Sequence, residues 1–380
     1  MLISYGNYNG AGGISREEAC SIVYSMAIDE LLSKASVLRD SIKGKVVTYS
    51  RKVFIPLTYL CRDRCSYCTY RKEPSDVDDI MLKPEHVLTL AEQGKRMGCT
   101  EALFMTGERP EQRYNEARQW LRSRGYSSTI EYIADMSRLV LDRVGLLPHT
   151  NAGNLTLDEV KMLKEYNASI GLMLENVSPR LMDNGMAHEH APSKHPMLRL
   201  KTMENAGRAG VAFTTGLLIG IGESMEEVID SLFAIRDIHE RYRHIQEIII
   251  QNFNPKPNTP MAYWSKPSRE YMLKVVALTR LIMPDMNIQV PPNLNPNFDE
   301  FLGSGINDWG GISPLTIDHI NPEAPWPSIE SVKRRTEAKG FRLRARFPVY
   351  PEYIRDEYLA SRVMEAINGM RDEYGLVRGY

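Results

Sequence analysis

Residues 53–68 read VFIPLTYLCRDRCSYC, an apolar run followed by three closely spaced cysteines. Three residues separate Cys61 from Cys65, and two separate Cys65 from Cys68. A loop this short can wrap three thiolates around one face of an iron–sulfur cube. Because no fourth cysteine stands nearby, one iron of that cube keeps an open coordination position. The segment therefore predicts a cluster that can bind and activate a ligand.

Four basic residues flank this loop, namely Arg62, Arg64, Arg71 and Lys72. We expect their positive charge to favour thiolate over thiol and to offset the charge of a ligated cluster. A structural zinc site is the alternative, but zinc takes four protein ligands, and this segment supplies three with no histidine at matching spacing. The two remaining cysteines, Cys20 and Cys99, lie in segments of helical pattern and are interpreted as small buried apolar residues.

The composition points to a soluble protein that acts on a small molecule. Of the 380 residues, 43% are hydrophobic, and 47 Lys plus Arg balance 48 Asp plus Glu, so charge favours neither nucleic acid nor an anionic membrane. Residues 1–13 lack the basic start and apolar core of a signal peptide. The apolar runs are far shorter than the ~20 residues of a membrane helix. Five cysteines, three of them clustered, disfavour a disulfide framework and fit a reducing cytoplasm.

Short apolar runs alternate with longer stretches of helical period, which is typical of βα units. Eight strands are predicted, at residues 53–58, 102–106, 146–150, 169–174, 212–219, 247–252, 288–291 and 312–316. Helical patterns also precede the first strand, at 14–38, and follow the last, at 328–340 and 351–370. The sequence thus predicts an α/β protein with a TIM-type (β/α)8 barrel at 45–320, an N-terminal helical extension at 1–44, and a C-terminal extension at 321–380 packed on the barrel.

Polar residues follow six of the predicted strands in turn. They are the cysteine loop, Thr106-Gly107-Glu108, His149 with Asn151, Glu175, Glu223, and Asn252 with Asn254. In such barrels the active site lies at the carboxyl ends of the strands, so we expect these residues to converge, although loops are polar in general. His149 can shuttle a proton there or can be a structural histidine. His188 and His190 lack a third ligand for a second metal and are interpreted as surface residues.

The cysteine loop, with Tyr67 before its third cysteine, resembles the motif of the radical S-adenosylmethionine (SAM) enzymes. The resemblance implies a [4Fe-4S] cluster on Cys61, Cys65 and Cys68, whose open iron binds the amino and carboxylate groups of SAM. It also implies that an electron from the reduced cluster splits SAM to a 5′-deoxyadenosyl radical, so that the cofactors carry the difficult chemistry.

The same resemblance implies which residues contact SAM. Thr106-Gly107-Glu108 matches an element whose glycine lets the backbone approach the methionine part of SAM, although threonine replaces its first glycine here. Residues 216–223 resemble the family's fifth-strand element near adenine. Glu175 and Arg199 resemble an acid and an arginine that reach the polar groups of SAM, a surface charge being the alternative for Arg199. The implied SAM contacts are Tyr67, Thr106, Gly107, Glu108, Asn151, Glu175, Arg199, Gly220 and Glu223, and the implied catalytic residues are His149 and Glu175.

Further motifs narrow this resemblance to one branch of the family. They are the segments at 52–58, 68–70, 106–111, 149–153, 309–314 and 321–327, and together they resemble the first subunits of the FO synthases. FO is 7,8-didemethyl-8-hydroxy-5-deazariboflavin, the chromophore of a hydride-carrying coenzyme. The resemblance implies closure of the deazaflavin ring on an adduct of a tyrosine-derived hydroxybenzyl group and ribityluracil. It also implies two partners, the second subunit, which makes the adduct, and an external electron donor.

Substrate contacts and two rival functions stay open. Hydrogen bonds from Asn252, Asn254, Asn293 and Ser313, and stacking by Trp309 or Tyr70, are hypotheses for holding the substrate. One rival is another radical SAM enzyme, of the biotin-synthase or menaquinone-pathway type. The other is a non-enzymatic iron–sulfur electron carrier in which Cys99 supplies a fourth ligand.

Overall fold

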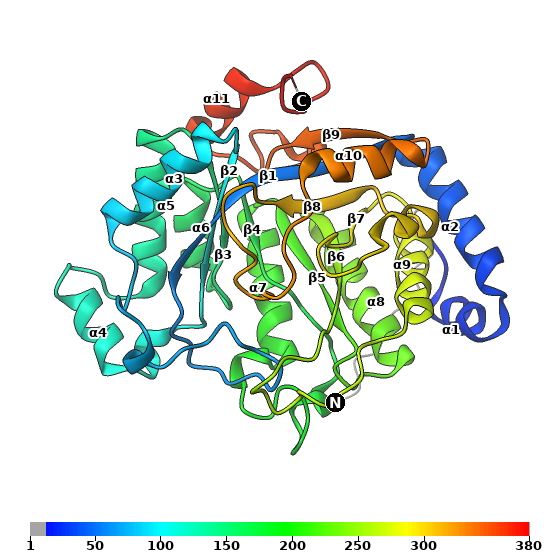
Figure 1. The fold of residues 1–380 in the computed structure, drawn as a ribbon, viewed down its shortest axis with the longest axis horizontal. Helices are drawn as coiled ribbons and strands as arrows, with labels where there is room; N and C mark the ends of the chain where they lie inside the picture. Colours follow the sequence, from blue (N-terminus) through cyan, green and yellow to red (C-terminus); the bar gives the residue numbers. More distant parts are fainter. Residues whose placement is uncertain (1–12, 380) are drawn as a thin grey trace.

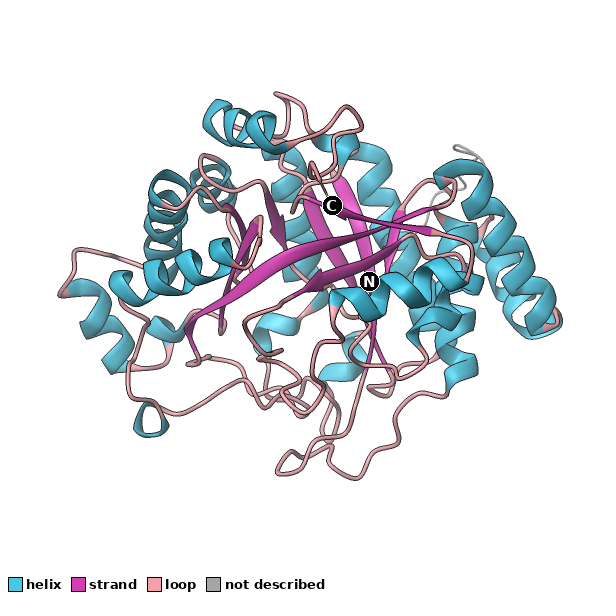
Figure 2. Cartoon of the chain, turned by 45° about the horizontal axis from the view of Figure 1, so that its top comes forward, coloured by secondary structure: helices cyan, strands magenta, loops and turns pink. Residues whose placement is uncertain are grey.

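The computed structural model describes residues 13–379 and confirms the predicted barrel. Residues 1–12, which belong to the predicted N-terminal extension, and Tyr380 lie outside the described residues. Eight parallel strands follow one another in the order β1 to β8, and pairing of β8 and β2 with β1 closes the ring. Helices surround the strands on the outside (Figures 1 and 2).

The strands of the described residues are β1 Val46–Thr58, β2 Glu101–Thr106, β3 Leu147–Asn151, β4 Ser169–Gly171, β5 Phe213–Ile219, β6 Ile245–Asn252, β7 Asn287–Gln289, β8 Asp308–Ile312 and β9 Arg342–Arg346. The α-helices are α1 Arg16–Ser25, α2 Ile28–Lys43, α3 Pro84–Arg96, α4 Asn115–Arg122, α5 Thr129–Arg143, α6 Leu157–Lys164, α7 Pro196–Ala209, α8 Met225–Tyr242, α9 Arg269–Ile282, α10 Ile329–Ala338 and α11 Ser361–Met370. Short 3-10 helices lie at Pro74–Asp76, Pro110–Gln112, Pro179–Met182, Pro192–Lys194, Phe298–Ser304 and Pro351–Tyr353.

The alternation of side chains along β1 explains how one strand serves two environments. Val53, Ile55 and Leu57 are fully buried in the main hydrophobic core, whereas Lys52 and Phe54 line a cavity inside the barrel. Successive side chains of a strand point to opposite faces, so one set packs outward and the other points inward. Gly94 of α3 lets that helix approach, because a Cβ there would lie 2.8 Å from the Val53 side chain.

The eighth strand differs from its predicted position. The expected strand at 312–316 is wrong, because β8 runs from Asp308 to Ile312 and contains Gly310 and Gly311. A Cβ on Gly311 would lie 1.8 Å from Cε of Lys52, and one on Gly310 would lie 1.9 Å from Nε2 of Gln289. The glycines thus leave room for inward side chains of the two neighbouring strands. Glycine also weakens the strand signal, which is why the sequence pattern placed this strand too late.

The two extensions also differ in detail from the expectation. The predicted helix at 14–38 is two helices, α1 and α2. The predicted helix at 351–370 is wrong over its middle, since only Pro351–Tyr353 and Ser361–Met370 are helical. The C-terminal extension also contributes β9, which the sequence analysis missed and which pairs with β1 from Val46 to Ser50. The last forty residues therefore begin by extending the barrel sheet.

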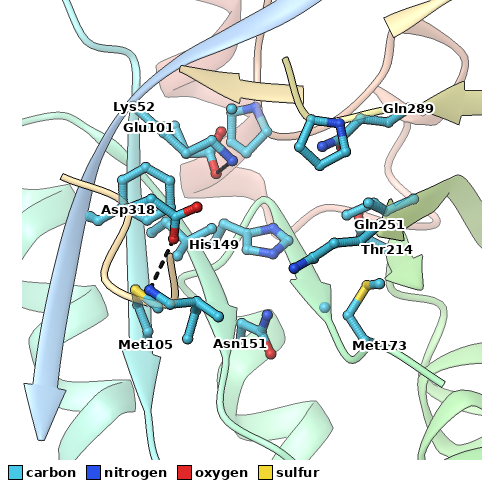
Figure 3. Close-up of a pocket in the computed structure, with 18 of the residues that line it drawn as sticks. Lys52, Glu101, Met105, His149, Asn151, Met173, Thr214, Gln251, Gln289 and Asp318 are labelled. Carbon is cyan, nitrogen blue, oxygen red and sulfur yellow. Dashed lines mark hydrogen bonds and ion pairs between the residues drawn. The ribbon is translucent and has the colours of Figure 1, made fainter. Parts of the chain in front are cut away.

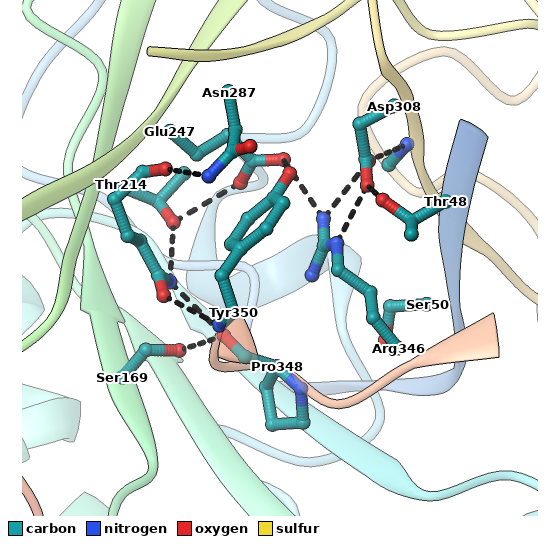
Figure 4. A network of polar contacts seen from close by, with 12 residues as sticks. Thr48, Ser50, Ser169, Thr214, Glu247, Asn287, Asp308, Arg346, Pro348 and Tyr350 are labelled. Carbon is teal, nitrogen blue, oxygen red and sulfur yellow. Dashed lines mark hydrogen bonds and ion pairs between the residues drawn. The ribbon is translucent and has the colours of Figure 1, made fainter. Parts of the chain in front are cut away.

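The chain directly after β9 closes the bottom of the barrel. We call Glu247, Asp308, Arg346 and Tyr350 the floor network (Figure 4). Arg346 lies 2.8 Å from the Glu247 carboxylate and 2.7 Å from the Asp308 carboxylate, and the Tyr350 hydroxyl donates to Glu247 at 2.8 Å. Each carboxylate is buried and paired with the same guanidinium. The network therefore fixes the C-terminal segment across the amino-terminal ends of β6 and β8.

Candidate active site

The three predicted cluster ligands line one pocket at the carboxyl ends of the strands. The backbone N–H of Glu108 donates to Sγ of Cys61 at 3.1 Å. A Cβ on Gly107 would lie 2.5 Å from Cβ of Cys61, so only glycine allows this close approach. Within residues 13–379, no three metal-binding side chains converge closely enough to share a single ion. The three thiols instead line a wider space, as ligands of separate irons in one cluster require.

Burial governs the acidity of these thiols. It raises the pKa of Cys61 to about 12 and the pKa of Cys65 well above its usual value. The flanking basic residues are not among the main charges that act on either thiol, and Arg71 pairs with Glu73 instead. None of the four basic residues lines the pocket of the three cysteines, so their effect on the thiols stays a prediction. Lys194, far away in sequence, is the cation that lowers the pKa of Cys65. Metal binding must displace the thiol protons.

Glu175 organises a group of polar side chains beside the cysteines. Its carboxylate accepts hydrogen bonds from the Tyr67 hydroxyl and from His188 at 2.9 Å, and it pairs with the Lys194 ammonium. Burial alone would raise the pKa of Glu175, but the charge of Lys194 and the hydrogen bond from His188 hold it well below its usual range. Its backbone has a φ of 65°, a strained conformation that surrounding contacts such as the hydrogen bond to Gly216 maintain.

Two members of this group were missed or misread in the sequence. His188 is buried against Glu175, so its interpretation as a surface residue is wrong, whereas His190 has a side chain that is 66% exposed. Lys194 carried no motif that could have identified it. Both residues belong to the long connection between β4 and α7, which lacks a regular hydrophobic period and gave no signal of burial.

Arg199 lies in the same pocket, and one of its buried nitrogen atoms has no hydrogen-bond partner among the described residues. It is 4% exposed, which rules out the surface alternative, and its Nη1 donates to the carbonyl of Met173. Its Nε and the hydroxyl of Thr106 have no hydrogen-bond partner among the described residues. Buried donors of this kind are normally satisfied, and a guanidinium matches a carboxylate ligand. Burial raises the pKa of the nearby Glu108 to about 6.

The other implied SAM contacts divide into two groups. Asn151 lines the pocket, as does Leu218 of β5. Gly220 and Glu223 do not line it. The Glu223 carboxylate accepts hydrogen bonds from the backbone N–H groups of Gly220, at 2.7 Å, and Ile221, at 2.8 Å. It therefore stabilises its own loop, and Leu218 takes the place of these two residues in the pocket wall.

A second cavity continues from this pocket into the barrel (Figure 3). The residues that line both spaces are Met105, Asn151, Leu172, Met173, Gln251 and Ile320. His149 points into this second cavity and does not line the pocket of the cysteines. Burial lowers the pKa of His149 to about 4, so its ring is neutral near pH 7. We call the pocket of the cysteines, at the carboxyl ends of the strands, the upper pocket. The cavity deeper in the barrel is called the lower cavity.

Comparisons with known proteins agree with this geometry. The sequence model of the radical SAM superfamily matches residues 55–235. The chain is 50% identical over 334 residues to the 7,8-didemethyl-8-hydroxy-5-deazariboflavin synthase of Methanopyrus kandleri, covering 88% of this chain and all of that relative. It is 48% identical over 355 residues to the synthase of Methanocaldococcus jannaschii, covering 93% and 98%. The chain belongs to the deazariboflavin synthase family of radical SAM proteins. The cofactors of this family are a [4Fe-4S] cluster and SAM.

Solved structures place this synthase family member in a familiar fold. The FeFe-hydrogenase maturase HydG from Carboxydothermus hydrogenoformans is 20% identical with a TM-score of 0.72, covering 96% of this chain and 86% of that one. Methylornithine synthase is 19% identical with a TM-score of 0.68, covering 87% and 94%. Within the described residues, no helix is both long and apolar enough to cross a membrane.

The upper pocket of this synthase family member fits both cofactors. The thiols of Cys61, Cys65 and Cys68 line one space, which suits a cluster held by three cysteines, and the unpaired Nε of Arg199 suits the carboxylate of SAM. The hypothesised substrate contacts fare differently. Trp309 is fully buried and donates to Thr336 at 2.9 Å, so it cannot stack on a substrate. The four polar residues proposed with it line neither space, and they are Asn252, Asn254, Asn293 and Ser313. Tyr70 does line the upper pocket.

Proposed function

We propose that this chain closes the deazaflavin ring. It converts 5-amino-5-(4-hydroxybenzyl)-6-(D-ribitylimino)-5,6-dihydrouracil and SAM to 7,8-didemethyl-8-hydroxy-5-deazariboflavin, methionine, 5′-deoxyadenosine, ammonia and a proton. The observation that carries the proposal is the continuity of the two spaces, because the pocket of the three cysteines shares six wall residues with a cavity that is lined by many hydrogen-bonding side chains. Identity of about half the residues to synthases of this name supports the same choice.

The roles of the residues follow from their positions. When bound, the cluster and SAM supply a radical that abstracts hydrogen from the substrate. Cys61, Cys65 and Cys68 hold the cluster, leaving one iron for SAM. Arg199 and Glu108 are the partners for the carboxylate and ammonium groups of SAM. Asn151, Thr106 and Tyr67 complete this set.

Glu175 and His149 remain the proposed catalytic residues, with separate tasks. Glu175 is held ionised by Lys194 beside the cysteines, so its task lies with SAM. His149 is neutral in the lower cavity, so its task lies with the substrate. The barrel walls keep water from both and align the reacting groups, which is the main contribution of the protein.

Two partners belong to this proposal. A second synthase subunit supplies the adduct, and an external donor supplies the electron that reduces the cluster. We further propose that the chain works in the cytoplasm, since its clustered cysteines need reducing conditions.

The direct test feeds the adduct to the anaerobically reconstituted and reduced enzyme and measures the fluorescent deazaflavin. We expect product from the wild type and none from Cys65→Ser. Cleavage of SAM without any deazaflavin would contradict the assignment and favour another radical SAM reaction. Loss of the cluster in Cys99→Ser would instead support the electron-carrier alternative, because it would show a fourth thiolate ligand.

A further inference from the structure

The lower cavity is polar where the interior of a (β/α)8 barrel is normally packed with aliphatic side chains. Its charged or hydrogen-bonding residues include Lys52, Glu101, Thr214, Glu247, Gln251, Gln289 and Arg346. Lys52 pairs with Glu101 across β1 and β2 at 2.8 Å. A cavity with this lining favours a ligand that offers many hydrogen bonds along its length.

The polarity of the cavity changes along its length. Lys52, Glu101 and Gln289 gather at one end, and Met105, Asn151 and Met173 lie at the other (Figure 3). The second end is the junction with the upper pocket, where the shared side chains are mostly apolar. The cavity therefore has a polar floor and an apolar entrance beside the cysteine site.

Hydrogen bonds around His149 decide which ring nitrogen faces the ligand. The Ser169 hydroxyl donates its single hydrogen to the carbonyl of Pro348 at 2.6 Å, so toward His149 it can only accept. Nδ1 of His149, 2.6 Å from that hydroxyl, must therefore carry the ring proton. Nε2 is then an acceptor, with no hydrogen bond to any described residue. Gly171 keeps it accessible, since a Cβ there would lie 2.8 Å from Nε2.

Two amide side chains of the cavity are also free. Gln251 and Gln289 make no side-chain hydrogen bond to another described residue, whereas the neighbouring Gln246 donates to Pro348 at 3.0 Å. Each free amide offers both a donor and an acceptor, which matches the adjacent carbonyl and N–H groups on the edge of a pyrimidinedione.

We propose that the ribityluracil end of the substrate lies in the lower cavity, where Nε2 of His149 accepts a hydrogen bond from it and Gln251 and Gln289 pair with its polar edge. The hydroxybenzyl end then lies between Met105 and Met173, next to the SAM site. This orientation matches the polar groups to the polar floor and the aromatic ring to polarisable methionines. This orientation rests on the proposed function and adds which end of the substrate lies next to the SAM site.

The test measures binding of the fluorescent product to the reconstituted enzyme by fluorescence anisotropy. We expect Gln289→Leu and His149→Phe each to weaken binding at least tenfold, because each leaves polar groups of the ligand unpaired. Gly171→Ala keeps the imidazole but blocks Nε2, and we expect a similar loss. Gln119→Leu, at an exposed position of α4, is the matched control and should bind as the wild type does.

A second ligand separates recognition from general damage to the fold. A deazaflavin that carries methyl in place of ribityl should bind weakly to the wild type. If it bound as tightly as the product, the orientation would be overturned. Equal product affinity in the wild type, Gln289→Leu and Gly171→Ala would overturn it as well. The visible absorption of the reconstituted cluster in Gln289→Leu and Gly171→Ala should equal that of the wild type, which would show that the fold is intact. A wild type that neither forms nor binds the deazaflavin would refute the proposed function itself, which is a different result from either of these.

Discussion

Replacing Arg346 with methionine tests the floor network most directly. Arg346 is 3% exposed and pairs with Glu247 and Asp308, and its guanidinium lies 4.2 Å from the centre of the Tyr350 ring. Methionine retains most of the side-chain volume but leaves two buried carboxylates without a cation. Removing one partner of a buried ion pair destabilises a protein by about 3–5 kcal/mol.

The expected change in melting temperature follows from the size of the chain. At about 2.1 cal/mol/K per residue, the unfolding entropy of this protein is about 0.8 kcal/mol/K. A loss of about 4 kcal/mol then lowers the melting temperature by about 5 °C. Calorimetry on the wild type and Arg346→Met measures this difference. Arg342→Met, at an exposed position of the same strand, is the control and should change the temperature by less than about 1 °C.

The pH dependence of this defect gives a second check. Burial already raises the pKa of Glu247 despite the charge of Arg346, and loss of that charge must raise it further. A carboxyl whose folded pKa exceeds its unfolded value contributes stability that is complete below the unfolded pKa and is lost as pH rises from there through the folded pKa. The deficit of Arg346→Met should therefore be smaller at pH 5 than at pH 8. A melting temperature equal to that of the wild type, or a deficit that grows at pH 5, would refute this reasoning.

Three further outcomes concern the upper pocket. Cys65→Ser should abolish the iron content and the visible absorption of the cluster, whereas Cys99→Ser should keep both, since Cys99 lies outside the pocket. Gly107→Ala should cut the iron content at least severalfold, because its Cβ would collide with the cysteine loop. Iron analysis after reconstitution measures this, and full iron loading of the variant would contradict it. Lys194→Met should weaken SAM binding about tenfold or more in equilibrium dialysis, because Glu175 loses its cation, while Lys201→Met on the exposed side of α7 should not; equal affinities in the two would show that this ion pair is not needed.

The barrel and the cysteine site could be predicted because each depends on local sequence. Apolar runs such as 53–57 alternate with helical periods, and Thr156 and Ser224 each begin a Ser/Thr-x-x-Glu sequence that forms a capping box, at the starts of α6 and α8. The cysteine spacing likewise places three thiols within eight residues. Local patterns therefore identified the elements and the loop whose three cysteines line the upper pocket.

The features that escaped prediction depend on contacts between distant segments. Lys194 and His188 reach Glu175 from an irregular connection, and nothing local marks them as buried. Trp309 was hypothesised to face the substrate, but its side of β8 packs against Phe298 and Thr336. A strand exposes alternate residues to opposite faces, and a one-residue difference in register exchanges them. Since β8 was placed too late along the chain, the faces of its residues could not be assigned correctly.

The position of β1 has a consequence for how the chain folds as it leaves the ribosome. Its first half pairs with β8 on one edge and with β9 on the other, so an early-made segment has to wait for partners synthesised more than 250 residues later. Such distant pairing slows folding and leaves apolar edges open in the meantime. A nascent chain halted before β9 would have an unpaired edge and an open floor, and it would be the form most dependent on chaperones.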